Sequence, residues 1–310
     1  MTKYVFGVDI GGTTVKMGLL DDQGNCIDKW EIPTRKEQSG SFILPDVAKA
    51  IDDKLSEKKI SKSDVIGVGV GVPGPVDGNG IIHGAVNLGW GDLDVNAELN
   101  KLTGLKAVAG NDANVAALGE MWKGGGKGFS SIVMVTLGTG VGGGIIIDGK
   151  MLSGSTGAGG EIGHIHLNDS ETVTCGCGGR GCLEQYASAT GISNLAKKHF
   201  AAWNKDTVLK GSDMSAKAVF DGVKAGDELC IEVAKEFGMW LGKGLAIIAS
   251  TVNPEAFVIG GGVSKAGDVL IDFFVPSFKE YVFPGAADCK MILATLGNDA
   301  GMYGAAKLAL

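Results

Sequence analysis

A cluster of one histidine and three cysteines constrains this chain more than any other feature. In the spacing H-x10-C-x-C-x4-C, its members are His164, Cys175, Cys177 and Cys182. Three thiolates and one imidazole make a closed tetrahedral ligand set for zinc, with no position left for water. Glycines between the cysteines let the backbone turn tightly. The spacing predicts a structural zinc that fixes a loop, with the carboxylates of Glu161 and Glu184 bracketing it for contact with a ligand.

The alternative is that these cysteines are simply buried, or form disulfides beside an unrelated histidine. Two cysteines in a C-x-C pair do not easily bridge to one another, and the other three, Cys26, Cys230 and Cys289, are isolated. The N-terminus runs directly into an apolar strand without the basic head and cleavage site of a signal peptide. No apolar run approaches a membrane span. We therefore expect a cytoplasmic protein with reduced thiols and no membrane partner.

Size and charge restrict the class of protein further. With 310 residues and 45% hydrophobic content, the chain is long enough for a large core and, we expect, two domains. The net charge is −7 and no basic run is present, which argues against a nucleic-acid partner. The 52 glycines lie in short clusters between β-branched runs. Such clusters at strand ends suggest a backbone that approaches a ligand, phosphate above all.

One strand–glycine loop–strand unit occurs twice. Tyr4–Asp9 is predicted to be a strand, followed by a loop and the strand Val15–Leu20, and Ile132–Thr136 begins the second copy. Placing Asp9 against Thr136 also aligns Gly11 with Gly138. This internal repeat predicts two related halves around a cleft.

Both loops offer backbone N–H groups and threonine hydroxyls to an anion. The alternative is a pair of tight hairpins that need glycine only for turn geometry. Two matched loops favour nucleotide phosphate binding, although neither fits the dinucleotide or Walker pattern. A third cluster, Gly260–Gly262, follows the predicted strand Glu255–Ile259 and would hold a nucleoside, or else is a strand-to-helix turn.

Two further stretches carry polar side chains at predicted strand ends or in loops. Asp112 follows a short strand and precedes a helical pattern, so it is either an N-cap or a carboxylate held at a strand–helix junction, where catalytic groups gather in α/β folds. Asn87 and Trp90 share a loop, where they would bond and wall a small polar ligand, or form common turn chemistry. The other predicted elements are a strand at 65–72 and helices at 42–55, 185–200, 225–248 and 299–310.

Taken together these motifs resemble the bacterial glucokinases of the ROK family. The resemblance rests on Asp9-Ile-Gly-Gly-Thr13, Asn87-Leu-Gly-Trp90, Asn111-Asp112, Thr136-Leu-Gly-Thr-Gly140, Glu161-Ile-Gly-His164, the cysteine cluster with Glu184, and Val258-Ile-Gly-Gly-Gly262. It implies a two-domain α/β protein with the actin-like, hexokinase-type ATPase fold, built from ribonuclease H-like domains around an interdomain cleft. We expect a smaller domain of residues 1–118 plus 297–310, and a larger domain of residues 119–296 that holds the zinc loop.

The resemblance also implies the site. Asp112 would be the general base that takes the proton from the sugar 6-hydroxyl. The sugar hydroxyls would be held by Asn87, Asn111, Asp112, Glu161, His164 and Glu184. His164 would bind zinc through one ring nitrogen and the sugar through the other. The ATP and Mg²⁺ contacts would come from Asp9, Gly11, Gly12, Thr13, Thr14, Lys16, Gly138, Thr139, Gly140, Gly261 and Gly262.

The function that we expect is transfer of the ATP γ-phosphoryl group to glucose. Two alternatives stay open: a kinase of the same family for N-acetylmannosamine, N-acetylglucosamine or fructose, and a non-catalytic sugar sensor. A zinc-knuckle nucleic-acid binder is disfavoured by the acidic charge. The family implies a homodimer or homotetramer.

Overall fold

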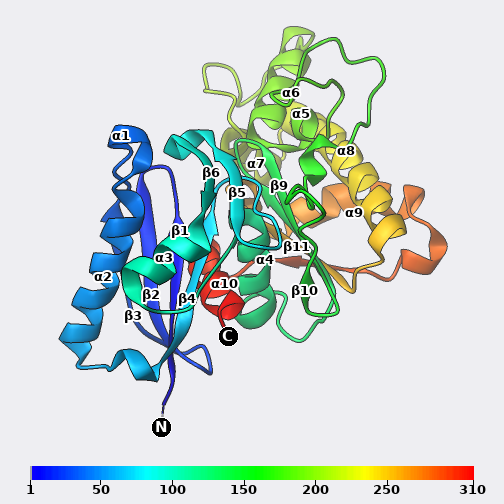
Figure 1. Cartoon of the computed structure of the whole chain (residues 1–310). Helices are drawn as coiled ribbons and strands as arrows, with labels where there is room; N and C mark the ends of the chain where they lie inside the picture. The colour runs from blue at the N-terminus through cyan, green and yellow to red at the C-terminus, as the bar shows by residue number, and fades with distance from the viewer. Residues whose placement is uncertain (1) are drawn as a thin grey trace. The chain divides into compact units, whose positions relative to one another are not determined.

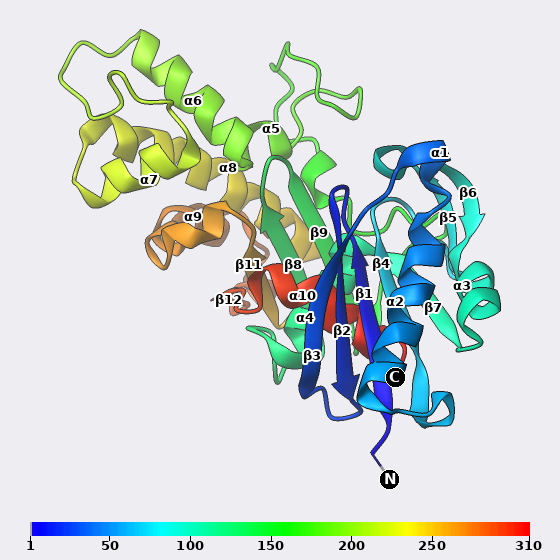
Figure 2. The same ribbon diagram turned by 90° about the vertical axis from the view of Figure 1, so that its left-hand side faces the viewer.

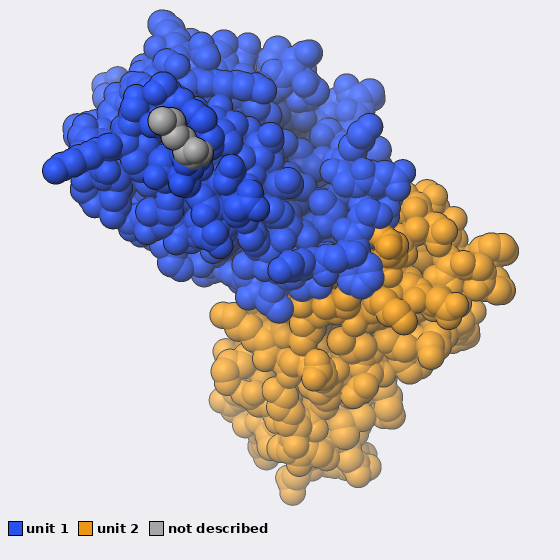
Figure 3. All heavy atoms as spheres, turned by 90° about the horizontal axis from the view of Figure 1, so that it is seen from below, with its two compact units in different colours: residues 1–132, 144–160, 295–310 blue, residues 133–143, 161–294 orange. Residues whose placement is uncertain are grey.

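The computed structural model describes residues 2–310 (Figure 1). The chain divides into two compact units, coloured separately in Figure 3. Unit 1 comprises Met1–Ile132, Gly144–Gly160 and Thr295–Leu310, and unit 2 comprises Val133–Gly143 and Glu161–Ala294. The chain therefore enters and leaves each unit more than once, which a two-domain protein with a single linker would not do. The domain boundaries expected from the sequence stay a prediction.

The first sheet has the strand order β3-β2-β1-β4-β7. Strands β1, β4 and β7 run parallel, whereas β2 and β3 are antiparallel to their neighbours. The carboxyl ends of β1, β4 and β7 therefore meet at one edge. The strands are β1 (Tyr4–Ile10), β2 (Thr14–Asp21), β3 (Cys26–Pro33), β4 (Val65–Val72) and β7 (Ala107–Asn111), with β5 (Ile81–Ala85) and β6 (Trp90–Asp94) in a separate hairpin.

Helices cover both faces of this sheet. Phe6 and Val8 of β1 join a core that includes Val47 and Ile51 of α2, the helix that lies along the sheet in Figure 2. The opposite face carries glycines: a Cβ at Gly69 would overlap the backbone of α10. The helices of unit 1 are α1 (Glu37–Gly40), α2 (Ile43–Lys58), α3 (Val95–Thr103), α4 (Asp112–Lys123) and α10 (Ala300–Leu308).

The alternation in Val65–Val72 explains how α10 comes so close. Successive side chains of a strand point to opposite faces, so Val68 and Val70 join the core with α2 while Gly69 faces α10. Glycine is required there because no side chain fits between strand and helix. The predicted strand at 65–72 is confirmed, but its two unlike faces were not foreseen.

The second sheet repeats the first in order, β10-β9-β8-β11-β12. Its first three strands form a meander, and β11 lies on the other side of β8, as β4 lies beside β1. The internal repeat read from the sequence is thus confirmed as a repeat of topology. The strands are β8 (Ile132–Leu137), β9 (Val141–Ile147), β10 (Lys150–Met151), β11 (Ala256–Gly260) and β12 (Lys290–Leu293).

The helices of unit 2 correct one prediction and confirm another. The helix expected at 185–200 is broken at Ser188, whose side chain caps the second segment by accepting from the N–H of Gly191. The long helix expected within 225–248 is confirmed; it begins at Glu228, after the N-cap Asp227, and ends at Val252. The helices are α5 (Glu184–Ala187), α6 (Ala189–Ala201), α7 (Ala216–Lys224), α8 (Glu228–Val252) and α9 (Val269–Tyr281). None of the helices formed by residues 2–310 has both the length and the apolarity to cross a bilayer.

Candidate active site

Two carboxylates come together at the edge where the parallel strands of unit 1 end. Asp9 pairs with Gly71 of β4, and the next residue of β4, Val72, pairs with Asn111 at the end of β7. Gly71 therefore separates Asp9 from Asp112, and a Cβ on it would lie 3.6 Å from Asp9 Oδ1 and 3.7 Å from Asp112 Cα. The missing side chain leaves the space between the two acids open.

Burial is the main cause that raises the pKa of Asp9 from its ordinary value of 3.8 to about 6. The negative charge of Asp112 raises this pKa further, and Lys16 lowers it. A half-buried acid next to a second acid is the environment in which a bound divalent cation relieves the most unfavourable charge. Carboxylate oxygens are the ligands that Mg²⁺ prefers, so this pair suits that ion.

Asp112 begins α4 but does not cap it. The cap is Asn111, whose side-chain oxygen accepts from the N–H groups of Ala113 at 3.0 Å and Asn114 at 3.1 Å. The alternative that made Asp112 the N-cap is therefore wrong. Asn111 also donates its side-chain N–H to Gly74 O at 3.1 Å, which fixes the chain on both sides of Asp112.

Asn87 lies in the 3₁₀ turn Val86–Leu88 and is exposed to solvent. Trp90 is not: it is 8% exposed and donates its indole N–H to Gly40 O at 3.1 Å. The expectation that Trp90 walls a ligand is therefore wrong, because its ring fills the core of unit 1.

The first glycine loop is held by hydrogen bonds within itself and to the end of β3. Gly11 N donates to Thr14 O at 3.0 Å. Thr34 N donates to Thr13 O at 2.9 Å, and Thr34 Oγ1 donates to Gly11 O at 2.7 Å. A Cβ on Gly12 would meet no atom within 4 Å, so the tip of this loop is open.

The second glycine loop has a different support. Gly138 N donates to Gly140 O at 3.0 Å, as Gly11 does to Thr14 in the first loop. The start of α6 then binds the loop, because Ala189 N donates to Gly138 O at 2.7 Å and Thr190 Oγ1 donates to Thr139 O at 2.8 Å.

Gly261 lies against the strand that leads into this second loop. Its φ is +86°, and a Cβ there would lie 2.5 Å from Leu137 O. Both the left-handed backbone and the close approach require glycine. The structure thus places Gly261 beside Leu137, the residue before the 138–140 loop, and the nucleotide role of both stays a prediction.

The histidine and three cysteines converge as their spacing predicts. Their donor atoms all lie within 4.8 Å of one another, and each of the six cysteines in the chain is free. His164 Nδ1 lies 3.8 Å from Cys175 Sγ, while Nε2 is directed toward Glu161 Oε2 at 3.9 Å. One ring nitrogen therefore faces the thiols and the other faces away from them. The donor set fits a closed tetrahedral zinc.

Glu184 links this cluster to the second glycine loop. One carboxylate oxygen lies 3.7 Å from Cys175 Sγ, and the other accepts from the N–H of Val141 at 3.0 Å. A Cβ on Gly140 would overlap that second oxygen. Gly140 is thus required to make room for Glu184, a role that the sequence did not reveal.

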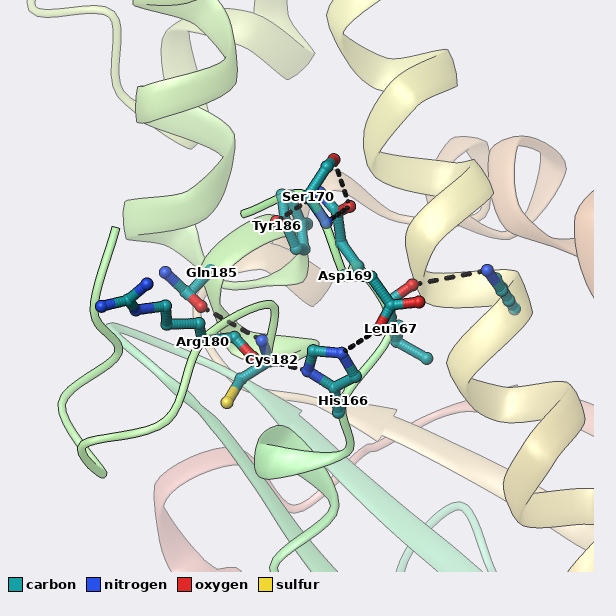
Figure 4. A network of polar contacts seen from close by, with 10 residues as sticks. His166, Leu167, Asp169, Ser170, Arg180, Cys182, Gln185 and Tyr186 are labelled. Carbon is teal, nitrogen blue, oxygen red and sulfur yellow. Dashed lines mark hydrogen bonds and ion pairs between the residues drawn. The ribbon is translucent and has the colours of Figure 1, made fainter. Parts of the chain in front are cut away.

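A polar network holds the backbone around the cluster (Figure 4). His166 Nδ1 donates to Arg180 O at 2.6 Å, and Nε2 donates to Asp169 Oδ1 at 2.8 Å. The Asp169 carboxylate is the main cause that raises the pKa of His166. Gln185 Oε1 accepts from Cys182 N at 3.1 Å. The loop is therefore held by hydrogen bonds from the segment that enters it and from the residues that follow it.

Residues 5–310 match the model of the ROK family. The chain belongs to the ROK family. It is 44% identical over 308 residues to a glucokinase of Halalkalibacterium halodurans, covering 97% of this chain and 93% of that protein. The fold is accordingly the two-domain actin-like, hexokinase-type α/β fold.

Solved structures agree with this ROK assignment. A ROK family glucokinase from Streptomyces griseus, in complex with glucose and AMPPNP, is 34% identical with a TM-score of 0.75, covering 98% of each chain. A ROK hexokinase from Thermus thermophilus is 30% identical with a TM-score of 0.80, covering 98% of this chain and 97% of that one.

Sequence reasoning missed several residues that shape the site of this ROK protein. Thr34 braces the first loop from an edge strand that the sequence did not reveal. Thr190 braces the second loop, and the Ser188 capping pattern two residues earlier was the available signal. Glu120, a fully buried acid of α4, had no recognisable pattern at all.

Proposed function

We propose that this ROK protein is an ATP-dependent hexose kinase that phosphorylates the 6-hydroxyl group of glucose, giving glucose 6-phosphate and ADP. The observation that carries the proposal is the pair Asp9 and Asp112 at the ends of parallel strands, one acid on each side of Gly71. One acid can hold a cation while the other accepts a proton. The 44% identity to a glucokinase supports glucose as the sugar.

Asp112 is the general base of the proposed reaction. It takes the proton of the 6-hydroxyl as that oxygen bonds to the γ-phosphorus and the bond to the β-phosphate oxygen breaks, releasing ADP. Asn111 is the N-cap of α4, and Asp112 Oδ1 accepts from Ala113 N at 2.8 Å, which orients the carboxylate at the start of the helix. A positioned base of this kind contributes about 10²–10⁴-fold to the rate.

Asp9 would hold Mg²⁺, which supplies charge neutralisation at the phosphates. The N–H groups of the two glycine loops would bind phosphate oxygens, with Thr13, Thr14 and Thr139 adding hydroxyls and Lys16 adding a positive charge beside Asp9. Gly261 and Gly262 would receive the nucleoside. Because glycine has no side-chain carbon, its backbone can approach a phosphate closely.

For the sugar, we assign hydroxyl contacts to Asn87, Asn111, Asp112, Glu161, His164 and Glu184. Carboxylates and amides suit this task because each accepts more than one hydrogen bond. Zinc bound by His164 and the three cysteines would be structural. It would hold Nδ1 of His164, leaving Nε2 and the neighbouring Glu161 for the sugar.

The deciding experiment measures ADP release across a panel of sugars with ATP and Mg²⁺. We expect the highest kcat/KM with glucose. A tenfold or greater preference for N-acetylmannosamine, N-acetylglucosamine or fructose would change the substrate but keep the reaction. Sugar binding without ADP release from any sugar would replace the kinase with a sugar sensor. A cytoplasmic location and a dimer or tetramer stay predictions.

A further inference from the structure

Glu120 is a fully buried carboxylate with an unusual set of partners. It is 0% exposed and lies on α4, two turns after Asp112. Its oxygens accept from three backbone N–H groups: Leu296 at 2.8 Å, Thr295 at 3.1 Å and Gly125 at 2.8 Å. Buried carboxylates are costly unless every lone pair is used. Such a group is retained for the position that it fixes.

The segment that Glu120 holds leads directly to the carboxylate pair. Thr295 is the first residue of the last stretch of unit 1. A few residues later, Asn298 O accepts from Lys16 Nζ at 3.1 Å. At the start of α10, a Cβ on Gly301 would lie 2.6 Å from the carboxyl carbon of Asp9. The position of this segment therefore limits where the Asp9 side chain can lie.

Helices α4 and α10 are also in direct backbone contact. A Cβ on Gly119 would overlap Ala300 O, and a Cβ on Gly304 would overlap Val115 O. These glycines allow the closest approach that two helices can make. Glu120 adds hydrogen bonds just before the start of α10, where Gly301 packs on Asp9, and Asp112 lies at the start of α4.

We propose that Glu120 is a positioning residue for phosphoryl transfer. It joins the helix that begins with Asp112 to the segment that packs on Asp9, and so sets the spacing between the base and the carboxylate for Mg²⁺. The kinetic part of this inference rests on the proposed kinase function, whereas the positional part does not. Misplacement of reacting groups by about 1 Å costs on the order of 10²-fold in rate.

The first test compares amide hydrogen exchange in the wild type, Glu120→Gln and the control Glu280→Gln, without ligands. Gln replaces one accepting oxygen with an N–H₂ group, which leaves a backbone N–H unpaired. Glu280 is exposed, so its variant loses the same charge without a buried partner. We expect faster exchange in Glu120→Gln at 295–301 and in the first turn of α4. Faster exchange confined to 124–131, or equal in both variants, would overturn the proposal.

The second test is kinetic. We expect Glu120→Gln to lower kcat per folded molecule by about 10²-fold and to raise the Mg²⁺ concentration for half-maximal rate, with glucose KM changed less than kcat. A lower Tm with unchanged kcat and Mg²⁺ dependence would make Glu120 purely structural. A wild type without kinase activity would refute the proposed function and leave the exchange result standing.

A second variant covers the case in which Glu120→Gln does not fold. Gly301→Ala places a methyl group against the Asp9 carboxyl from α10, at a residue that is not itself a hydrogen-bond partner of Glu120. We expect the same rise in Mg²⁺ requirement. Unchanged Mg²⁺ dependence in Gly301→Ala would show that α10 does not set the position of Asp9, and would overturn the proposal.

Discussion

The loop between β1 and β2 and the loop between β8 and β9 occupy equivalent places in two sheets of the same strand order. Each closes with a hydrogen bond from its first glycine, Gly11 or Gly138, at 3.0 Å. Their surroundings differ. The first loop follows Asp9, whereas the equivalent position before the second loop is Thr136. Only the first half therefore presents an acid at the end of its first strand.

The second half has an acid from another source. Glu184 comes from the insertion that carries the histidine–cysteine cluster, and its carboxylate meets the loop at Val141 N. The two halves thus share a backbone loop, but the acid beside it comes from the first strand in one half and from an inserted segment in the other. In the proposed function, the shared loops would bind phosphate and the unlike acids would give the two halves different roles. Variants in the first half and variants in the second half should therefore have different effects.

The largest expected effect is on the acid of the first half. Asp112→Asn should lower kcat by about 10²–10⁴-fold while glucose binding persists, since Asn keeps the shape but does not accept the proton. Because Asn111 provides the cap, α4 should remain stable. Steady-state kinetics and calorimetric glucose titration measure this. Near-normal turnover would remove the general base from the proposal.

Loss of the metal cluster should be the next largest effect, and it should be confined to the sugar. Cys177→Ser removes one of four ligands, so zinc should be lost and the glycine-rich loop should gain freedom. Ordering even two residues again costs roughly 2–4 kcal/mol, which weakens glucose binding by about 10²-fold. ATP affinity should change much less. Metal analysis, circular dichroism and separate titrations measure this.

Cys26→Ser is the matched control for that variant, because Cys26 is exposed and distant in sequence from the cluster. It should keep zinc and both affinities. A folded, zinc-free Cys177→Ser protein that binds and phosphorylates glucose normally would show that the cluster has no part in sugar binding.

The two glycines of the second loop separate nucleotide from sugar. A Cβ on Gly138 would meet only Gly140 O, at 4.0 Å, so Gly138→Ala leaves the loop in place and obstructs only an incoming phosphate. Loss of one charge-assisted hydrogen bond, about 1.5–3 kcal/mol, should weaken ATP binding by about tenfold or more. Gly140→Ala should instead displace Glu184 and weaken glucose binding. Calorimetry with each ligand distinguishes the two, and equal ATP affinity in Gly138→Ala would exclude a phosphate role.

The parts of the site that are formed by residues close together in the chain could be predicted from the sequence. The convergence of His164 with the three cysteines, the strands around the first loop and the acid after β7 were all predictable, because spacing and periodicity encode them directly. The repeat of the two sheets was visible as well, since Asp9 aligns with Thr136 and Gly11 with Gly138.

What the sequence did not give depends on contacts between distant segments. Gly140 resembles any loop glycine until Glu184 is placed beside it, more than forty residues later in the chain. Trp90 was assigned to a ligand wall, but its indole N–H reaches Gly40 O in the core. Glu120 binds residues from the far end of the chain. No periodicity or motif reports such pairings, because they depend on how the elements pack.

The smallest effect concerns stability, and it tests whether the first half is shaped for a cation. The pKa of Asp9 is raised from 3.8 to about 6, so the folded protein without metal holds the charged form unfavourably. That cost is absent below pH 4, grows between pH 4 and 6, and is complete above pH 6. Asp9→Asn should therefore stabilise the metal-free protein at pH 8 by roughly 1–3 kcal/mol, with the gain vanishing near pH 4. Denaturant unfolding at both pH values measures this.

In the wild type, added Mg²⁺ and ATP should raise the Tm, while Asp9→Asn should lose that response together with most activity. If Asp9→Asn is less stable than the wild type at pH 8, the Asp9 carboxylate stabilises the fold. Its role would then be structural rather than cation binding.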